Sequence, residues 1–201
     1  MSYSNFSIES VSSEFQLCVS DQEDLFGSIS PVEVGPQLSA HLEEYVPMAI
    51  GIGTEKGRSE LIVAPMLLDV RRRMGGSIGF FSGVEFNVDA SRGLNGVCDF
   101  LLSKSRLQIM VTAPVLAVVE AKKDDIRSGL GQCASEMIAV QVFNERAGQA
   151  PSTVYGVVTT GTAWRFLSLD ETALAIDRLE YPIDHAGKVL GILIHCVGGR
   201  P

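Results

Sequence analysis

The chain has 201 residues, 46% of them hydrophobic, and a formal net charge of -8 at pH 7. This length suits one well-packed domain and is short for two. The apolar stretches are too short to span a membrane, and the acidic charge argues against a protein that coats nucleic acid through a broad basic surface.

The negative charge is concentrated at the start of the chain. Residues 1–55 contain nine Asp or Glu and no Lys or Arg, whereas the remaining 15 acidic residues are balanced by all 16 basic ones. We therefore interpret residues 1–201 as a single domain. In this interpretation the acidic leading segment packs on or extends a core of residues 56–170, and residues 171–201 form a C-terminal extension.

The cysteines are far apart in the sequence and form no metal-binding or disulfide pattern: Cys18, Cys98, Cys133 and Cys196. This spacing is typical of buried thiols in a reducing compartment. The chain does not start with a basic segment followed by an apolar one, so we expect no secretory signal and a cytoplasmic location.

The leading segment predicts little regular structure before Pro36. Residues 1–13 are polar and rich in serine, so we expect the ends of this segment to be loose, and residues 15–19 alternate as a short strand does. Pro36 is suited to the first position of a short helix, and Pro47 is expected to end that helix.

A second helix is expected from Ser59 to Arg73, with a kink or a later start at Pro65. Glu60 lies in its first turn. The run Arg71–Arg73 at its end favours the helix dipole, and we prefer that interpretation to a phosphate clamp.

Three strands are predicted next, over Phe80–Asp89, Val97–Leu102 and Val115–Lys122. Asp99 is a lone carboxylate within the apolar second strand. The third strand is an apolar run that ends with Glu120 and Lys122, which alternation places on the same face. A carboxylate and an ammonium group there are costly to bury unless they are paired or bind a ligand.

The helix expected from Asp124 to Asn144 presents Gln132 and Glu136 four residues apart on one face. The rest of the chain predicts a hairpin and a last helix, over residues 154–160, 163–169 and 184–197. Trp164 and Phe166 share one face of that hairpin and are expected in the core. Together these elements predict an α/β (α+β) fold with a central mixed β-sheet flanked by helices.

The order of the polar residues resembles the PD-(D/E)XK nuclease superfamily, which has a restriction-endonuclease-like fold. The resemblance covers residues 56–169 and depends on Asp99, on Glu-x-Lys at residues 120–122, and on Gln132 in the next helix. The family's proline is absent before Asp99. The resemblance implies metal-dependent phosphodiester hydrolysis of nucleic acid, with DNA as the expected substrate.

Five residues are candidates for the catalytic set: Glu60, Asp99, Glu120, Lys122 and Gln132. Asp99, Glu120 and Glu60 are the candidate metal ligands, since their hard oxygen atoms suit Mg²⁺ or Mn²⁺. Lys122 would orient the attacking water or stabilise charge on the phosphate in the transition state. Gln132 would hydrogen-bond the water or a phosphate oxygen, with Glu136 supporting it.

The same residues also have structural interpretations. Asp99 and Lys122 could form a buried ion pair between strands, Glu60 could favour the helix dipole, and Gln132 could hold a backbone group. The alternative function is a catalytically inactive nuclease-fold module that acts in binding or assembly through protein contacts, including a homodimer. The basic residues that could contact DNA are Arg58, Arg92, Lys104, Lys123 and Arg127.

Overall fold

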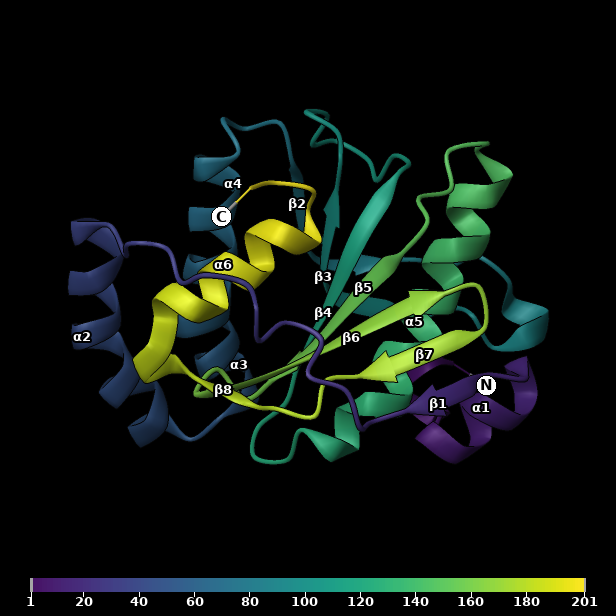
Figure 1. The fold of residues 1–201 in the computed structure, drawn as a ribbon, viewed down its shortest axis with the longest axis horizontal. Coiled ribbons are helices and arrows are strands. Elements are labelled where there is room, and N and C mark those ends of the chain that lie inside the picture. Colours follow the sequence, from purple (N-terminus) through teal and green to yellow (C-terminus); the bar gives the residue numbers. More distant parts are fainter. Residues whose placement is uncertain (1, 201) are drawn as a thin grey trace.

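In a computed structural model that describes residues 2–200, a mixed β-sheet lies between two layers of helices (Figure 1). The strands of this part of the chain are β1 (Cys18–Ser20), β2 (Gly79–Glu85), β3 (Val97–Ser103), β4 (Val115–Ala121), β5 (Val154–Thr159), β6 (Ala163–Asp170), β7 (Ala173–Ile176) and β8 (Tyr181–Pro182). Their order is β1-β7-β6-β5-β4-β3-β2, and β8 pairs with β6. Only β4–β5 and β1–β7 are parallel pairs among these strands. The predicted class, a central mixed sheet flanked by helices, is confirmed.

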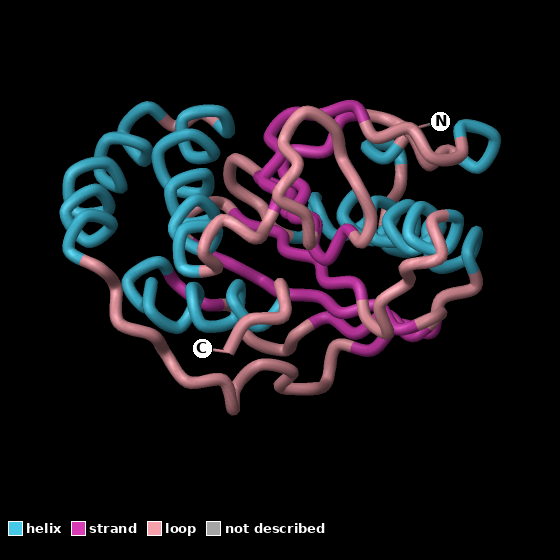
Figure 2. The backbone as a smooth tube through the Cα atoms, turned by 90° about the horizontal axis from the view of Figure 1, so that it is seen from above, coloured by secondary structure: helices cyan, strands magenta, loops and turns pink. Residues whose placement is uncertain are grey.

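Helices cover both faces of this sheet (Figure 2). They are α1 (Ile8–Phe15), α2 (Pro36–Ile52), α3 (Glu55–Arg58), α4 (Ala64–Arg73), α5 (Arg127–Arg146) and α6 (Ala186–Cys196), with short turns η1 (Tyr3–Asn5), η2 (Ser59–Val63), η3 (Ala90–Arg92) and η4 (Ile183–His185). In Figure 1, α2, α4 and α6 lie to the left of the sheet, and α1 and α5 lie to its right. Among residues 2–200, no helix is both long and apolar enough to cross a membrane.

Alternation along β3 and β4 divides their side chains between two cores. Phe100 and Val119 are partners across the two strands, and both belong to the core beneath α4 and α6. The next pair, Leu101 and Val118, belongs to the core beneath α5. Since successive residues of a strand point to opposite faces, the apolar run of β4 fills both cores. The strand is therefore buried on both sides, as its sequence indicates.

The prediction that the ends of residues 1–13 are loose is wrong for the described residues from Ser2 onward. They form η1 and α1, and Tyr3 and Phe6 are buried against α5. The approach is close, because a Cβ atom on Gly131 of α5 would lie 2.3 Å from the backbone oxygen of Phe6. The serine-rich composition suggested a loose segment, but the buried aromatic side chains of Tyr3 and Phe6 hold it against α5.

Of the two prolines within predicted helices, Pro47 acts differently from the prediction. Helix α2 continues through Pro47 to Ile52, although Pro47 was expected to end it. The helical path from Glu55 to Arg73 includes the π turn η2, in which the Ala64 N–H donates to the Ser59 carbonyl. Pro65 lies in the first turn of α4, directly after this π turn, so the later start predicted at Pro65 is confirmed.

The acidic leading segment is joined to the rest of the structure at several places. β1 pairs with β7 at one edge of the sheet. The Lys188 ammonium group of α6 donates to the carbonyls of Phe26 and Gly27 at 2.7 and 3.0 Å. The Arg73 side chain donates to the Glu33 carbonyl at 2.7 Å and also pairs with the buried Asp69. The domain boundaries at residues 55 and 170 stay predictions.

A buried amide on α5 fixes the start of β4. Asn144 donates to the Val115 carbonyl and accepts from the Val115 N–H, both at 2.8 Å. We expect Asn144→Ala to lower the free energy of unfolding by about 2–4 kcal/mol, because it leaves two buried backbone groups unpaired. Urea unfolding measures this change. Gln141→Ala, which removes one exposed bond to the Glu171 carbonyl, should cost less than about 1 kcal/mol; equal losses would contradict the assignment.

Candidate active site

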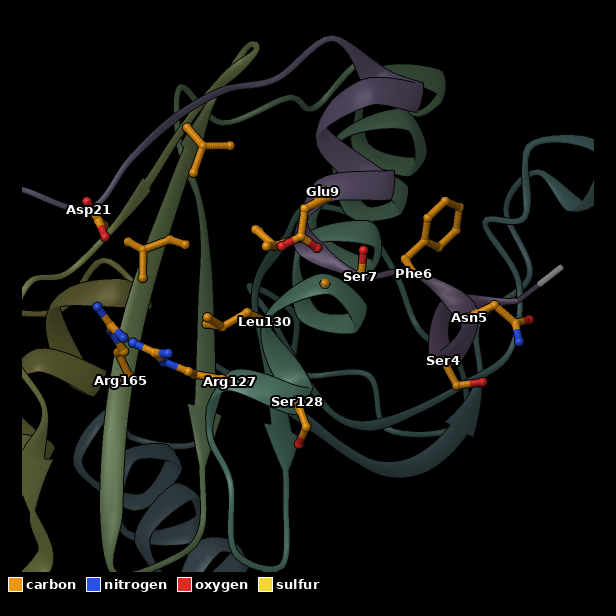
Figure 3. Close-up of a pocket in the computed structure, with 14 residues that line it drawn as sticks. Ser4, Asn5, Phe6, Ser7, Glu9, Asp21, Arg127, Ser128, Leu130 and Arg165 are labelled. Carbon is orange, nitrogen blue, oxygen red and sulfur yellow. The ribbon is translucent and has the colours of Figure 1, made fainter.

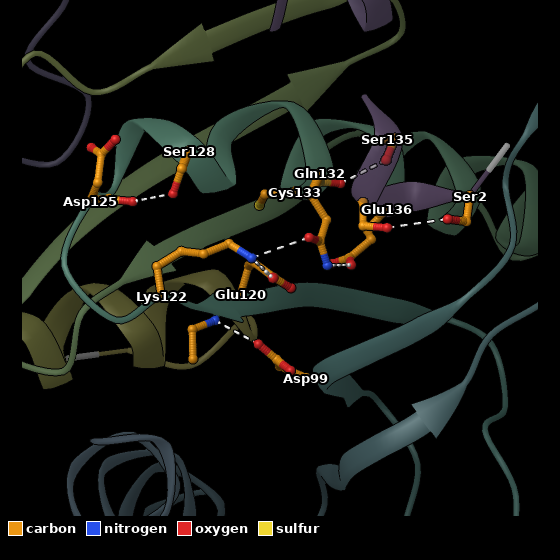
Figure 4. A network of polar contacts seen from close by, with 12 residues as sticks. Ser2, Asp99, Glu120, Lys122, Asp125, Ser128, Gln132, Cys133, Ser135 and Glu136 are labelled. Atoms are coloured by element: carbon orange, nitrogen blue, oxygen red, sulfur yellow. Dashed lines mark hydrogen bonds and ion pairs between the residues drawn. The ribbon is translucent and has the colours of Figure 1, made fainter. Parts of the chain in front are cut away.

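The ends of β3 and β4 bring Asp99 and Glu120 to neighbouring positions. The register pairs Phe100 with Val119, so Asp99 and Glu120 are the next pair along. Asp99 Oδ2 accepts a hydrogen bond from the Ala121 N–H at 2.9 Å (Figure 4). The Asp99 charge also acts on Glu120, where it raises the pKa. The two carboxyl groups therefore belong to one electrostatic cluster.

A chain of side-chain contacts leads from Glu120 to the interior of α5 (Figure 4). Lys122 Nζ lies 2.5 Å from Glu120 Oε1 and donates to Gln132 Oε1 at 3.2 Å. Gln132 Nε2 in turn donates to Glu136 Oε1 at 3.1 Å. The predictions that Glu120 and Lys122 share a face, and that Gln132 and Glu136 are neighbours, are confirmed.

Burial is the main cause of the raised pKa values in this cluster. It raises the pKa of Glu120 to about 8, with a further contribution from Asp99 and opposition from Lys122. Burial also raises the pKa of Asp99, although the Ala121 N–H and Lys122 oppose the rise. The pKa of Glu136, which is fully buried, lies well above the ordinary value because of desolvation and the Glu120 charge. Three carboxyl groups thus share one ammonium group.

Lys122 stays an ammonium ion in this environment. Burial lowers its pKa, but the charge of Glu120 and its hydrogen bond, together with the charges of Glu55 and Asp99, outweigh burial and leave the pKa raised. Its side chain retains 17% exposure, and its Nζ atom contacts Glu120 and Gln132. The structural alternative of an Asp99–Lys122 ion pair is not formed, since Lys122 pairs with Glu120 and Asp99 with the Ala121 N–H.

The carboxylate oxygens of Asp99 and Glu120 are suited to a hard divalent cation, although they are few. In residues 2–200 no group of three or more His, Cys, Asp or Glu side chains is arranged to hold a metal ion. Mg²⁺ commonly takes only one or two protein carboxylates and keeps several waters. Glu120 Oε2 is buried and has no hydrogen-bond partner in the described chain. Asp99 and Glu120 are therefore the residues that could hold Mg²⁺ or Mn²⁺.

A cavity of about 220 Å³ opens on the side of Asp99 that faces α3. Glu60 lines it together with Asp99, but the Glu60 carboxylate pairs with Lys56 at 2.8 Å and is 61% exposed. Glu55, at the start of α3, lines the same cavity, and its charge raises the pKa of both Glu120 and Lys122. The proposed metal role of Glu60 stays a prediction.

Sequence reasoning missed Glu55 because it was counted as the last residue of the acidic leading segment. A local signal was available in the sequence. Thr54 is the N-cap of α3 and accepts from the Gly57 N–H at 3.0 Å, which identifies a helix start one residue before Glu55. A helix starting there places Glu55 and Glu60 in neighbouring turns, so both carboxylates reach one cavity.

The basic residues named from the sequence as possible DNA contacts lie in different environments. Arg58 donates to the Thr160 carbonyl at 3.0 Å and so supports the turn between β5 and β6. Arg92 lies over the Phe15 ring, and Lys123 lies 3.5 Å from Asp124. Arg127 lines a separate pocket. Trp164 and Phe166 are buried in the core, as predicted.

Comparisons with protein-family models, with curated proteins and with solved structures gave no match to this chain. The chemistry of the site must therefore be argued from its own residues.

Proposed function

We propose that this protein is a metal-dependent nuclease that hydrolyses phosphodiester bonds of DNA at a site of the PD-(D/E)XK type. The proposal includes the restriction-endonuclease-like form of the fold, the Mg²⁺ or Mn²⁺ requirement and the DNA substrate. A cytoplasmic location and a homodimer stay predictions.

The observation that carries the proposal is the buried cluster at the ends of β3 and β4. Asp99, Glu120 and Glu136 all have raised pKa values, and within residues 2–200 Lys122 is the one ammonium group that opposes the rise at each of them. A structural ion pair needs no such excess of carboxyl groups, and burying them costs stability. Strongly perturbed carboxyl groups beside an open cavity are typical of functional sites. Once deprotonated, this excess of carboxyl groups is suited to a divalent cation.

Each residue of the cluster has a chemical task under this proposal. Asp99 and Glu120 would hold the cation, which polarises the scissile phosphate and activates a water when bound. Lys122 can donate to a phosphate oxygen or to the attacking water, since an ammonium group has three donors and its side chain is not fully buried. The Gln132 side chain positions Lys122 through its Oε1 atom. Glu136 holds that amide in the orientation that presents oxygen to Lys122.

Cleavage assays with linear, circular and single-stranded DNA, each with Mn²⁺ or with EDTA, test this proposal. We expect cleavage in Mn²⁺ alone and no cleavage by Glu120→Ala. Comparing the three substrates identifies the strandedness and whether an end is needed. If the folded protein neither cleaves any of these substrates nor binds Mn²⁺, the proposed nuclease function is wrong. The alternative function, an inactive binding or assembly module, would then remain.

Glu55 and Glu60 are expected to differ in their effect on metal binding. Glu55→Gln should weaken Mn²⁺ binding by about tenfold, because its charge acts on Glu120 and Lys122. Glu60→Gln should change it by less than about twofold, since that carboxylate is exposed and already paired with Lys56. Calorimetric titration of each variant with Mn²⁺ measures the difference. A larger loss for Glu60→Gln would instead favour the ligand set expected from sequence.

A further inference from the structure

A second, larger pocket lies on the α5 side of the sheet, away from the cavity at Asp99. It has a volume of about 770 Å³ and is bordered by η1, by the start of α1 and by the first turn of α5 (Figure 3). Arg127 and Arg165 both line it, and their guanidinium groups extend into the same part of the pocket (Figure 3). This size accommodates a nucleotide.

The two arginines lack strong anionic partners within residues 2–200. No carboxylate oxygen lies within 4.0 Å of the Arg127 guanidinium, and the nearest to Arg165 is Glu180 Oε1 at 4.0 Å. Glu9 and Asp21 also line the pocket but form no ion pair with either arginine. Arg165 is held in place because its Nε donates to the Asp177 carbonyl at 2.9 Å. Two neighbouring guanidinium groups without a shared carboxylate suit an anion.

The position of Arg127 supports this interpretation. It is the first residue of α5, whose first turn contains no acidic residue, and its N–H donates to the Asp125 carboxylate just before the helix at 2.9 Å. The helix dipole disfavours a cation at this end and favours an anion. An anion bound beside Arg127 would therefore interact favourably with both the side chain and the helix dipole. The arginine by itself is not stabilised by that dipole.

The sheet register relates this pocket to the candidate active site. Glu120 pairs with Val158, and Val158 pairs with Arg165, so the three residues form one row across β4, β5 and β6. Two strand spacings separate Glu120 from Arg165, or roughly 10 Å. A nucleic-acid strand advances about 3.4 Å per nucleotide along its axis, so this distance corresponds to two or three nucleotides.

Only the first turn of α5 lies between Lys122 of the candidate active site and the arginine pocket. A Cβ atom on Gly129 would lie 3.1 Å from Lys122 Cε, so Gly129 covers Lys122 directly. Its neighbours Ser128 and Leu130 line the arginine pocket. A strand that passes over this turn would contact Lys122 on one side and the arginines on the other.

We propose that Arg127 and Arg165 bind a backbone phosphate of the nucleic-acid substrate, two or three nucleotides from the bond at the candidate active site. This inference rests on the proposed nuclease function and adds a phosphate subsite to it. Glu9 and Asp21, across the pocket, confine the anionic part of the ligand to the arginine side.

Fluorescence anisotropy with a short labelled single-stranded oligonucleotide tests the subsite in EDTA, where no cleavage occurs. Arg127→Ala should weaken binding by about tenfold and should reduce the dependence of log affinity on log salt by about 0.7. Arg106→Ala is the matched control, because Arg106 is an exposed arginine in the loop between β3 and β4, at the opposite end of β4 from Glu120. It should change affinity by less than about twofold. Binding by Arg127→Ala within twofold of wild type, or equal losses in both variants, would overturn the subsite.

Two further comparisons complete the test. Oligonucleotides with a 5′-phosphate and with a 5′-hydroxyl should lose affinity equally in Arg127→Ala; a loss confined to the phosphorylated strand would overturn the internal position in favour of a strand end. Cleavage in Mn²⁺ is measured in parallel. If the protein binds the oligonucleotide in an Arg127-dependent way but does not cleave DNA, only the proposed nuclease function is overturned. If it cleaves DNA but Arg127→Ala binds as tightly as wild type, only the subsite is overturned.

Discussion

Lys122→Met is expected to reduce the rate of DNA cleavage by about 10³-fold while the protein stays folded. Lys122 is the ammonium group of the buried cluster, and its contacts with Glu120 and Gln132 fix its position. Methionine keeps the length of the stem that packs beneath Gly129 but removes the charge. The loss should appear in kcat, because charge on the phosphate develops in the transition state.

Lys123→Met is the matched control for this prediction. Lys123 is the next residue, is 58% exposed, and contacts only Asp124 among the charged groups of residues 2–200. It should alter cleavage by less than about threefold, because an exposed pair contributes little. Thermal unfolding of both variants verifies folding. Equal activity of Lys122→Met and wild type would remove Lys122 from the chemistry and leave it as the counterion of Glu120.

Sequence patterns within a single strand or helix were sufficient to predict the burial of that element and which of its side chains share a face. The apolar run of β4 predicted a strand buried on both faces, and the spacing of Glu120 and Lys122 predicted that they share a face, where they are in contact. The four-residue spacing of Gln132 and Glu136 predicted in the same way that they share a helix face, where they form a hydrogen bond. These relations depend only on strand and helix periodicity.

Relations between distant segments could not be predicted from periodicity. Glu55 reaches the cavity at Asp99 because α3 packs across the end of the sheet, and nothing in its local sequence specifies that packing. The short strand β7 was not predicted, since four residues of Ala-Leu-Ala-Ile become a strand through their pairing with β6 and β1. Tyr3 and Phe6 are ordered by α5, not by their serine-rich neighbours.

The metal-free protein is expected to lose stability as the pH rises from about 5.5 to 8.5. The pKa of Glu120 is raised from 4.5 to about 8 in the folded state, so the folded protein holds a proton that the unfolded chain has released. Stability from such a group is fully present below the unfolded pKa and is lost as the pH passes through the folded pKa. The full shift corresponds to on the order of 5 kcal/mol. Asp99 and Glu136 have raised pKa values too, and they act in the same direction.

Thermal unfolding in EDTA across this pH range should therefore show a melting temperature that falls by on the order of 10 °C. Glu120→Gln, which stays neutral, should flatten the profile, whereas Glu145→Gln at an exposed position of α5 should leave it unchanged. A melting temperature that rises with pH in wild type would contradict the cluster as described.

Added Mn²⁺ should reverse the loss at pH 8.5 and have little effect at pH 5.5. Carboxyl groups must be deprotonated to bind a metal, so protons and the cation compete for Glu120 and Asp99. At high pH the cation supplies the positive charge that the cluster lacks, and it stabilises the folded state by mass action. Glu120→Gln should abolish this stabilisation. The same excess of buried carboxyl groups that weakens the metal-free fold would then be the source of its affinity for the cation.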